Sequence, residues 1–294
     1  MRVTWELPSS VPIQLVSAPS VFSNTVAAVT LLFALLLYYL YKNKHGAKIE
    51  CHGKCIVVTG CDSGFGQQLV MDAVAAGFEV VAACYTEDGA AQYDDVRIHT
   101  VVADLTTAEG RTRVVDAARS IPRVKKSGLH ALVNNAGISP KGENGERLDT
   151  LGTDLSTWGK VFHVNFFASV ILARGLKEEL LSAQGAIVNV TSIAGSRVHP
   201  FAGAAYATSK AALGALTREM SKDFGPLGVR VNAIAPGEVK TAILSEGTDK
   251  IVADIPMKRL GLPEEVADTI FYLCSKEASY VSGAEIEING GQHV

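Results

Sequence analysis

The chain has 294 residues, of which 48% are hydrophobic and 19% are charged, and this length is enough for one large α/β domain with its own core. A formal net charge of -3 and the lack of a long basic run argue against nucleic acid as a partner. The five cysteines are scattered without the paired spacing of a zinc site or a disulfide framework, so we expect reduced thiols.

The N-terminal segment differs from the rest, because no charged residue occurs between Glu6 and Lys42. Residues 21–41, VFSNTVAAVTLLFALLLYYLY, are mostly apolar and have about the length, roughly 20 residues, that a bilayer-spanning helix needs. Tyrosines close the run and lysines follow it, a pattern that places the C-terminal part in the cytosol. We predict a tail over 1–20, a transmembrane anchor over 21–41 and a linker over 42–52.

Two other interpretations of residues 21–41 stay open. A cleaved signal peptide would have a basic start close to a shorter apolar core and a small-residue cleavage site, which the tyrosines and lysines fit poorly. A buried core helix is the plain alternative, but nearly every face of the segment is apolar. The anchor predicts a single-pass membrane protein that contacts membrane lipid, with its catalytic domain facing the cytosol.

From about residue 53 onward, strand-like and helix-like segments alternate. Short apolar runs predict strands over 55–59, 79–84, 98–105, 131–137, 185–192, 229–237 and 284–290. Apolar residues at helical spacing predict helices over 66–77, 107–121 and 204–224. This alternation predicts a single α/β domain over 53–294, with a Rossmann-type, doubly wound parallel sheet of about seven strands and helices on both faces.

A glycine-rich turn, TGCDSGFG, joins the first strand to the first helix of this domain. Gly60 lets the chain turn sharply, and Gly64 and Gly66 remove side chains where a pyrophosphate and the helix approach. The helix N-terminus supplies free N–H groups for the phosphates. The spacing is G-x-x-x-G-x-G rather than the commoner G-x-G-x-x-G. A plain turn explains one glycine but not three so placed, so we predict a dinucleotide cofactor here.

A second constellation is YATSK, at the start of the helix over 204–224. Tyr206 and Lys210 lie four positions apart and therefore share one helical face. A nearby ammonium favours the phenolate and lowers the pKa of a phenol, as general acid/base catalysis at neutral pH requires. Ser192 follows the fifth strand at the carboxyl edge, where open α/β sheets bind ligands, and its hydroxyl would hold a substrate oxygen. The plain alternative is an ordinary helix-surface pair.

Together these segments resemble the short-chain dehydrogenase/reductase family over residues 53–294. The motifs that carry the resemblance are, in chain order, TGCDSGFG, NNAG, HVN, TSIAG, YATSK, VNAIAPGEVKT, PMKRLGLPEEVA and SYVSGAEIEINGG. The resemblance implies an NAD(P)-dependent oxidoreductase that acts on CH–OH groups. In such enzymes the cofactor carries the hydride chemistry, and the protein supplies orientation and proton transfer.

The resemblance also implies a role for each matching residue. Tyr206 is the catalytic acid/base, Lys210 lowers its pKa and binds the nicotinamide ribose, Ser192 orients the substrate, and Asn165 holds a water in a proton relay. The implied cofactor-binding residues are Gly60, Ser63, Gly64, Phe65, Gly66, Asp104, Leu105, Asn135, Ala136, Gly137, Tyr206, Lys210, Pro236, Gly237, Val239 and Thr241.

Among the implied cofactor-binding residues, some have a particular partner. Asp104 would contact the adenine, Asn135 the adenosine ribose, and Val239 and Thr241 the nicotinamide end.

The loop between Ser192 and Tyr206 departs from the family pattern. The two residues lie 14 positions apart, about one more than is usual in the family. Either an extra residue around VHPFAG absorbs the difference, or Thr191 or Ser196 takes the place of Ser192.

The cofactor choice is a second departure. The second predicted strand ends at Cys84, where an acidic residue normally grips the ribose hydroxyls of NAD. Tyr85 follows in place of the arginine that would accept a 2′-phosphate, and Ser63 in the glycine turn is not basic. Glu87 and Asp88 lie just beyond and would repel a phosphate. We predict NAD, with NADP as the alternative.

The two halves of the domain resemble different branches of the family. GCDSGFG followed by AACYTEDGA resembles the branch of retinol dehydrogenases, oxidative hydroxysteroid dehydrogenases and 3-hydroxybutyrate dehydrogenase, which mostly prefer NAD. The C-terminal half, GPLGVRVNAIAPGEVKT to INGG, resembles 3-oxoacyl-carrier-protein reductases and bacterial alcohol dehydrogenases. The residues that would line an apolar substrate pocket, or would simply pack as a helix, are Ala242, Ile243, Leu244, Ile251 and Val252.

These features predict a membrane-anchored dehydrogenase of a lipophilic alcohol or ketone of steroid, retinoid or long-chain type, because a tether keeps an enzyme near substrates that partition into lipid. A 3-oxoacyl thioester reductase of fatty-acid metabolism is the near alternative. An inactive nucleotide-binding interaction module is the third, and the intact set of Asn165, Ser192, Tyr206 and Lys210 argues against it.

The helix over 204–224 also carries small residues, namely Ala207, Ala211, Ala212, Gly214 and Ala215. Small residues allow close helix approach, and members of the family pair through this helix. We therefore expect a homodimer or homotetramer. The alternative is that the small residues pack against the protein's own sheet.

Overall fold

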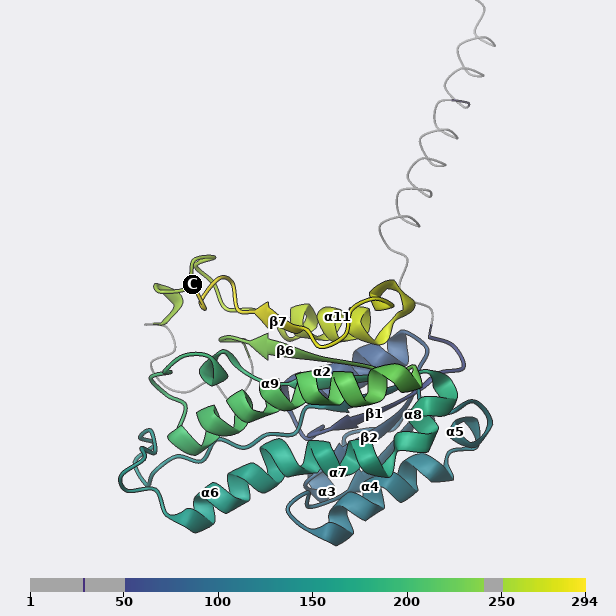
Figure 1. Cartoon of the computed structure of the whole chain (residues 1–294), viewed down its shortest axis with the longest axis horizontal. Coiled ribbons are helices and arrows are strands. Elements are labelled where there is room, and N and C mark those ends of the chain that lie inside the picture. The colour runs from purple at the N-terminus through teal and green to yellow at the C-terminus, as the bar shows by residue number, and fades with distance from the viewer. Residues whose placement is uncertain (1–28, 30–50, 241–250) are drawn as a thin grey trace, which may run out of the picture. The chain divides into compact units, whose positions relative to one another are not determined.

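A computed structural model describes residues 29, 51–240 and 251–294 of the chain (Figure 1). Within them, seven strands form one sheet in the order β3-β2-β1-β4-β5-β6-β7, and every neighbouring pair is parallel. The strands are β1 (Cys55–Thr59), β2 (Glu79–Cys84), β3 (Ile98–Val102), β4 (Ala131–Asn134), β5 (Ala186–Val190), β6 (Arg230–Pro236) and β7 (Glu285–Ile288). The predicted doubly wound parallel sheet is confirmed.

Helices connect successive strands and lie on both faces of the sheet (Figure 1). The α-helices are α2 (Gly64–Ala75), α3 (Glu87–Ala91), α4 (Ala108–Ser120), α5 (Pro122–Ser127), α6 (Leu155–Phe162), α7 (Ala168–Gly175), α8 (Lys177–Ala183), α9 (Ala204–Phe224) and α11 (Pro263–Cys274). The shorter elements are the π-helix η1 (His163–Phe167) and the 3-10 helices η2 (Ile193–Gly195), η3 (Gly225–Leu227) and η4 (Lys276–Ala278).

Both faces of the sheet are covered, which explains why its strands are apolar at nearly every position. Successive strand residues point to opposite faces. Ile56 and Val58 pack with buried residues of α2 and α11 on one face. Val57 packs with buried residues of α4, α7 and α9 on the other. The two layers leave the carboxyl ends of the strands open for a site.

The structure agrees closely with the elements predicted from the sequence. β1, β2 and α9 have the predicted bounds, and β3 to β7 each end one to three residues earlier than predicted. Only α2, α4 and α9 were predicted; the helices α3, α5, α6, α7, α8 and α11 were not. Cys55, Cys61, Cys84 and Cys274 are free thiols.

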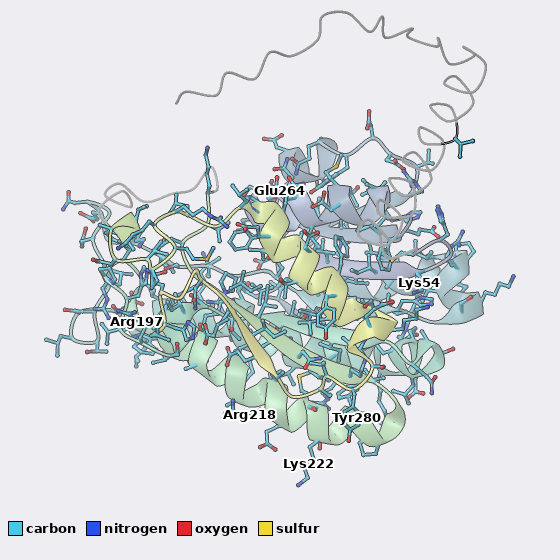
Figure 2. The ribbon with its side chains drawn as sticks, turned by 90° about the horizontal axis from the view of Figure 1, so that it is seen from above. Lys54, Arg197, Arg218, Lys222, Glu264 and Tyr280 are labelled. Atoms are coloured by element: carbon cyan, nitrogen blue, oxygen red, sulfur yellow. The ribbon has the colours of Figure 1, made fainter. Side chains whose placement is uncertain are left out.

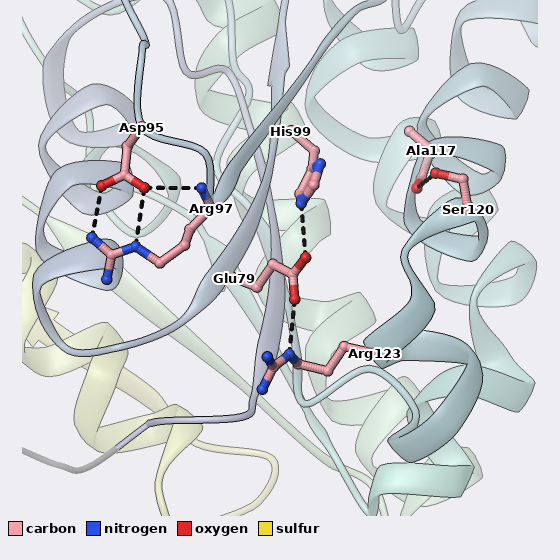
Figure 3. A network of polar contacts seen from close by, with 7 residues as sticks. All are labelled: Glu79, Asp95, Arg97, His99, Ala117, Ser120 and Arg123. Atoms are coloured by element: carbon pink, nitrogen blue, oxygen red, sulfur yellow. Dashed lines mark hydrogen bonds and ion pairs between the residues drawn. The ribbon is translucent and has the colours of Figure 1, made fainter.

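Charged side chains link the amino ends of the strands, which lie away from the open carboxyl ends. Glu79, at the start of β2, accepts a hydrogen bond from Arg123 Nε on α5 at 2.8 Å, and its other oxygen lies 2.8 Å from His99 Nε2 on β3 (Figure 3). A second ion pair joins Arg97 to Asp95 at 2.7 Å. The contacts of Glu79 join β2, β3 and α5 at the amino ends of the strands, remote from their carboxyl ends.

The predicted membrane anchor is not tested by this structure. No helix within residues 51–240 and 251–294 is long and apolar enough to cross a bilayer. The predicted tail, anchor and linker fall outside the described residues, apart from positions 29, 51 and 52.

Candidate active site

A cavity of about 850 Å³ opens at the carboxyl ends of the strands. Its walls include residues at or just after the ends of β1 to β6, where open α/β sheets bind their ligands. Of the predicted cofactor-binding residues, those that line it are Gly60, Ser63, Gly64, Phe65, Gly66, Asp104, Leu105, Asn135, Ala136, Gly137, Tyr206, Lys210, Pro236 and Gly237. Val239 lines an adjoining cavity, and Thr241 lies outside the described residues.

The glycine turn has the shape of a phosphate cradle. Gly60 and Gly64 have φ of +72° and +61°, a region that favours glycine. A Cβ on Gly66 would lie 2.1 Å from the carbonyl oxygen of Gly60, so no side chain fits there. α2 begins at Gly64, and Ser63 before it makes no side-chain capping bond. First-turn N–H groups therefore stay available for a pyrophosphate, and the cradle fits a dinucleotide.

Buried hydrogen bonds brace this turn from β1 and β4. The hydroxyl of Thr59 accepts from the backbone N–H groups of Asn135 and Ala136 at 3.1 and 3.0 Å. The amide of Asn135 donates to the carbonyls of Thr59 and Gly60 at 2.8 and 3.1 Å. Asn135, predicted to contact a ribose, thus holds the turn with its amide, and Thr59 is a structural residue that the sequence analysis missed.

Tyr206 and Ser192 meet on the cavity wall. Burial raises the pKa of Tyr206 above its ordinary value; a hydrogen bond with the Ser192 side chain lowers that pKa by less, and the negative charge of Glu238 adds a smaller rise. The two alternatives to Ser192 bond elsewhere, since the hydroxyl of Thr191 donates to Ile234 O at 2.8 Å and that of Ser196 to Ile193 O at 3.0 Å. Ser192 is therefore the serine or threonine that faces Tyr206.

Lys210 lies one helical turn below Tyr206 and is buried. Its Nζ donates to the carbonyl of Val190 at 2.6 Å and lies 5.7 Å from the centre of the Tyr206 ring. Burial lowers the pKa of Lys210 to about 8, so the side chain is mostly an ammonium at neutral pH. The expected fall in the pKa of Tyr206 is not seen, because burial of the phenol outweighs the bond from Ser192.

Asn165 lies behind the cavity wall rather than on it. It is in the π-helix η1, a rare local winding that often marks functional sites. Its Oδ1 accepts from Ile138 N at 2.8 Å, and its Nδ2 donates to Ile138 O at 3.1 Å and to Ser209 Oγ at 3.0 Å. The side chain joins η1 to the loop after β4 and to α9, which places it next to the site without facing a substrate.

Two acidic residues, Asp62 and Asp104, line the larger cavity. Asp104, after β3, accepts from the backbone and hydroxyl of Thr106 at 2.8 and 2.7 Å, bonds that hold its pKa below the usual range. Asp62, in the glycine turn, contacts the residues that follow β2. Asp62 was not among the predicted site residues.

A second cavity of about 370 Å³ adjoins the first and shares six lining residues with it, namely Phe65, Gly137, Ser139, Ser192, Tyr206 and Gly237. Three charged or titratable side chains from three loops line it, namely Lys141, His199 and Glu238. His199 is buried, and its Nε2 lies 2.8 Å from Glu238 Oε1. These residues were not predicted, although His199 belongs to the loop already noted as longer than usual. Of the predicted pocket residues, 242–244 lie outside the described residues, Ile251 is buried and Val252 is half-buried.

The family model described as Enoyl-(Acyl carrier protein) reductase matches residues 60–293. The chain belongs to the short-chain dehydrogenase/reductase family. It is 33% identical to the 3-oxoacyl-[acyl-carrier-protein] reductase FabG of Aquifex aeolicus, over 83% of this chain and 99% of FabG. It is 30% identical to the 7alpha-hydroxysteroid dehydrogenase of Escherichia coli, over 83% of this chain and 95% of that enzyme.

Two further proteins have a higher sequence identity to this chain. Protein FixR of Bradyrhizobium diazoefficiens is 60% identical over 181 residues, which are 60% of this chain and only 65% of FixR. A crystal structure of a Brucella ovis oxidoreductase of the same family, in complex with a partially ordered NAD, is 47% identical with a TM-score of 0.68, and the match covers 80% of this chain and 99% of that one. The chain is an NAD(P)-dependent oxidoreductase that acts on CH–OH groups.

Proposed function

We propose that this protein is a membrane-anchored, NAD(H)-dependent dehydrogenase that transfers a hydride between nicotinamide and a lipophilic alcohol or ketone. The observation that carries the proposal is the contact of Ser192 with Tyr206 above the buried Lys210, at the junction of the two cavities. The glycine turn at Gly60, Gly64 and Gly66 lines the larger cavity and has a shape that fits a dinucleotide, which supports cofactor binding there.

Each side chain has one task in the proposed reaction. The bound nicotinamide supplies or accepts the hydride. The Ser192 hydroxyl orients the substrate oxygen, and the Tyr206 oxygen takes the hydroxyl proton during oxidation or returns it during reduction. The Lys210 ammonium, fixed by the Val190 carbonyl, favours the phenolate by its charge. Asn165 holds the loop after β4 and α9 together behind these residues.

The substrate class is argued from the anchor and the second cavity. The apolar residues 21–41 would place the enzyme beside substrates dissolved in lipid, and a relative acts on a hydroxysteroid by name. Phe201 and Val239 give the second cavity apolar walls, whereas Lys141, His199 and Glu238 give it a polar side. We propose an amphipathic substrate, with an apolar body and a polar group that reaches these three side chains.

The second candidate function is a 3-oxoacyl thioester reductase. The FabG relative and the family model favour it. An inactive nucleotide-binding module is disfavoured, because Ser192, Tyr206 and Lys210 are brought together in one wall.

A homodimer or homotetramer in the membrane, with the catalytic domain facing the cytosol, completes the proposal. On α9, Gly214 is buried against its own domain, whereas Ala211 and Ala215 are exposed. Arg218 and Lys222 point outward from the same helix (Figure 2). A monomeric mass of the full chain in detergent would contradict the assembly.

The experiment that tests the function is a substrate and cofactor panel on the full chain in detergent, read by NADH formation or consumption. We expect turnover of steroid, retinoid or long-chain secondary alcohols with NAD. Faster reduction of a 3-oxoacyl thioester would favour the second candidate. Turnover of only small water-soluble alcohols would contradict the lipophilic substrate.

A further inference from the structure

We propose that Asp62 is an internal anion that occupies the place of an adenosine 2′-phosphate, and that it thereby makes the protein select NAD(H) over NADP(H). The inference deepens the proposed function and rests on the larger cavity being the dinucleotide site.

Asp62 makes three hydrogen bonds to the segment that follows β2. Its Oδ2 accepts from the backbone N–H of Tyr85 at 2.8 Å. Its Oδ1 accepts from the backbone N–H of Thr86 at 2.9 Å and from the Thr86 hydroxyl at 2.8 Å. Asp62, Tyr85 and Thr86 all line the cavity. The carboxylate therefore reaches from the glycine turn to the end of β2, where the sequence offers only the buried Cys84.

These three donors are of the kind that bind a phosphate. Consecutive backbone N–H groups and a neighbouring hydroxyl together make a concave anion site. Here a carboxylate of the protein itself takes all three. A 2′-phosphate would have to displace Asp62 from these donors or lie beside its negative charge, and both are unfavourable. An NADP-type cofactor is thus disfavoured in two ways: Asp62 already occupies the donors that would bind its phosphate, and the charge of Asp62 repels that phosphate.

The same carboxylate suits a ribose with free hydroxyls. An ionised carboxylate has about four lone-pair positions, and three of those on Asp62 are in use, which leaves one to accept from a ribose hydroxyl. The acid that normally performs this task comes from the end of the second strand. In this protein it would come from the glycine turn instead.

The surroundings hold Asp62 in this position. Gly89 is buried against it, and a Cβ on Gly89 would lie 2.3 Å from Asp62 Oδ1. Gln92 donates to the carbonyl of Asp62 at 3.2 Å. By contrast, Glu87 and Asp88, which the sequence analysis expected to repel a phosphate, are exposed and are not among the cavity-lining residues that the structure describes. The selectivity is therefore assigned to Asp62 alone.

The test compares dissociation constants for NADH and NADPH, measured by fluorescence titration of the full chain in detergent. We expect the unmodified protein to bind NADH about ten-fold or more tightly than NADPH, the effect of one charge-assisted hydrogen bond. Asp62→Ser frees the three donors, so NADPH binding should tighten about ten-fold while NADH binding weakens. Asp62→Asn keeps the shape, removes the charge and leaves one acceptor oxygen in place of two, so the preference should move in the same direction.

Glu87→Gln and Asp88→Asn are the matched controls, because each removes one negative charge from a neighbouring exposed position. They should change the NADH/NADPH ratio less than about two-fold, as screened surface charges do. A control that changes the ratio as much as Asp62→Ser would overturn the proposal. So would Asp62→Asn with an unchanged ratio, and this variant decides the matter if Asp62→Ser does not fold. A wild-type protein that binds neither dinucleotide would overturn the proposed function itself.

Discussion

The two ends of the active-site region are built in different ways. At the cofactor end, Thr59, Asp62 and Asn135 bond mainly to backbone groups and fix the chain's path around the cavity. At the substrate end, His199 and Glu238 come from different loops and contact each other. The cofactor end is thus fixed by contacts to the main chain, whereas the second cavity is lined by loop side chains, and loops in general vary more in sequence than the elements they connect.

The largest expected effect falls at the junction of the two ends. Tyr206→Phe removes the proposed proton donor and acceptor but keeps the ring, so we expect kcat to fall about 10²- to 10⁴-fold. The Kd for NADH should stay within about two-fold, because the phenol is a small part of a large cofactor contact. Steady-state rates and fluorescence titration measure both. A variant that keeps more than a tenth of the rate would contradict the acid/base role.

The cofactor end is tested by Thr59→Val, which removes a buried hydroxyl without changing the side chain's shape. The N–H groups of the half-buried residues Asn135 and Ala136 then lose their acceptor. We expect the free energy of unfolding to fall by about 1–3 kcal/mol, with weaker NADH binding. Urea denaturation measures the change. Thr59→Ser keeps the hydroxyl and should restore most of the loss; equal destabilisation by both would show that the methyl packing matters instead.

The substrate end is tested by Glu238→Gln. Burial is the main cause of the raised pKa of Tyr206 and the charge of Glu238 adds to it, so removal of that charge should lower the pKa by a small amount. Oxidation requires the phenolate, and its rate should therefore rise at a lower pH than in the unmodified protein. KM for the substrate should increase about ten-fold, because the proposed hydrogen bond between the Glu238 carboxylate and the polar group of the substrate loses its charge.

His199→Gln serves as the control for Glu238→Gln, since it leaves the carboxylate in place. The pH–rate profile of this control should not move to lower pH. If the pH–rate profile of Glu238→Gln does not move, the proposed effect of Glu238 on Tyr206 is contradicted. If the Kd of this variant for NADH changes strongly, the substrate end and the cofactor end are not independent.

The smallest effect is expected at the amino edge of the sheet, remote from both ends. Arg123→Gln removes the partly exposed ion pair with Glu79. Such pairs contribute about 0–1 kcal/mol, so stability should change by no more than that. The catalytic rates and the dissociation constants for NADH and NADPH should be unchanged. A change in either would show that the amino edge influences the site.

Most of the cofactor end could be predicted from the sequence, because its residues follow apolar runs that end at the carboxyl edge of a parallel sheet. The contacts that fix the site could not. Asp62 meets Tyr85 across 23 positions, and Thr59 meets Asn135 across 76, and no local pattern reports such pairings. The pair of His199 and Glu238 depends in the same way on two loops that meet only in the folded chain.

The role of Asn165 was predicted from its motif alone. Its bonds to Ile138 and Ser209 depend on the π-helix η1, which widens the helix at that point. Local helix winding of this kind has no signal in the apolar pattern of residues 155–175, and the helices α6 and α7 themselves were not predicted.

The burial of Lys210 has a thermodynamic consequence for the whole domain. Its pKa falls from 10.5 to about 8 on folding, so between these values the unfolded chain binds more protons than the folded one. This residue therefore makes the folded state more stable as pH rises from about 8 to 10.5, and less stable at neutral pH. At neutral pH, where the proposed chemistry uses the Lys210 ammonium, burial of this charge therefore lowers the free energy of unfolding.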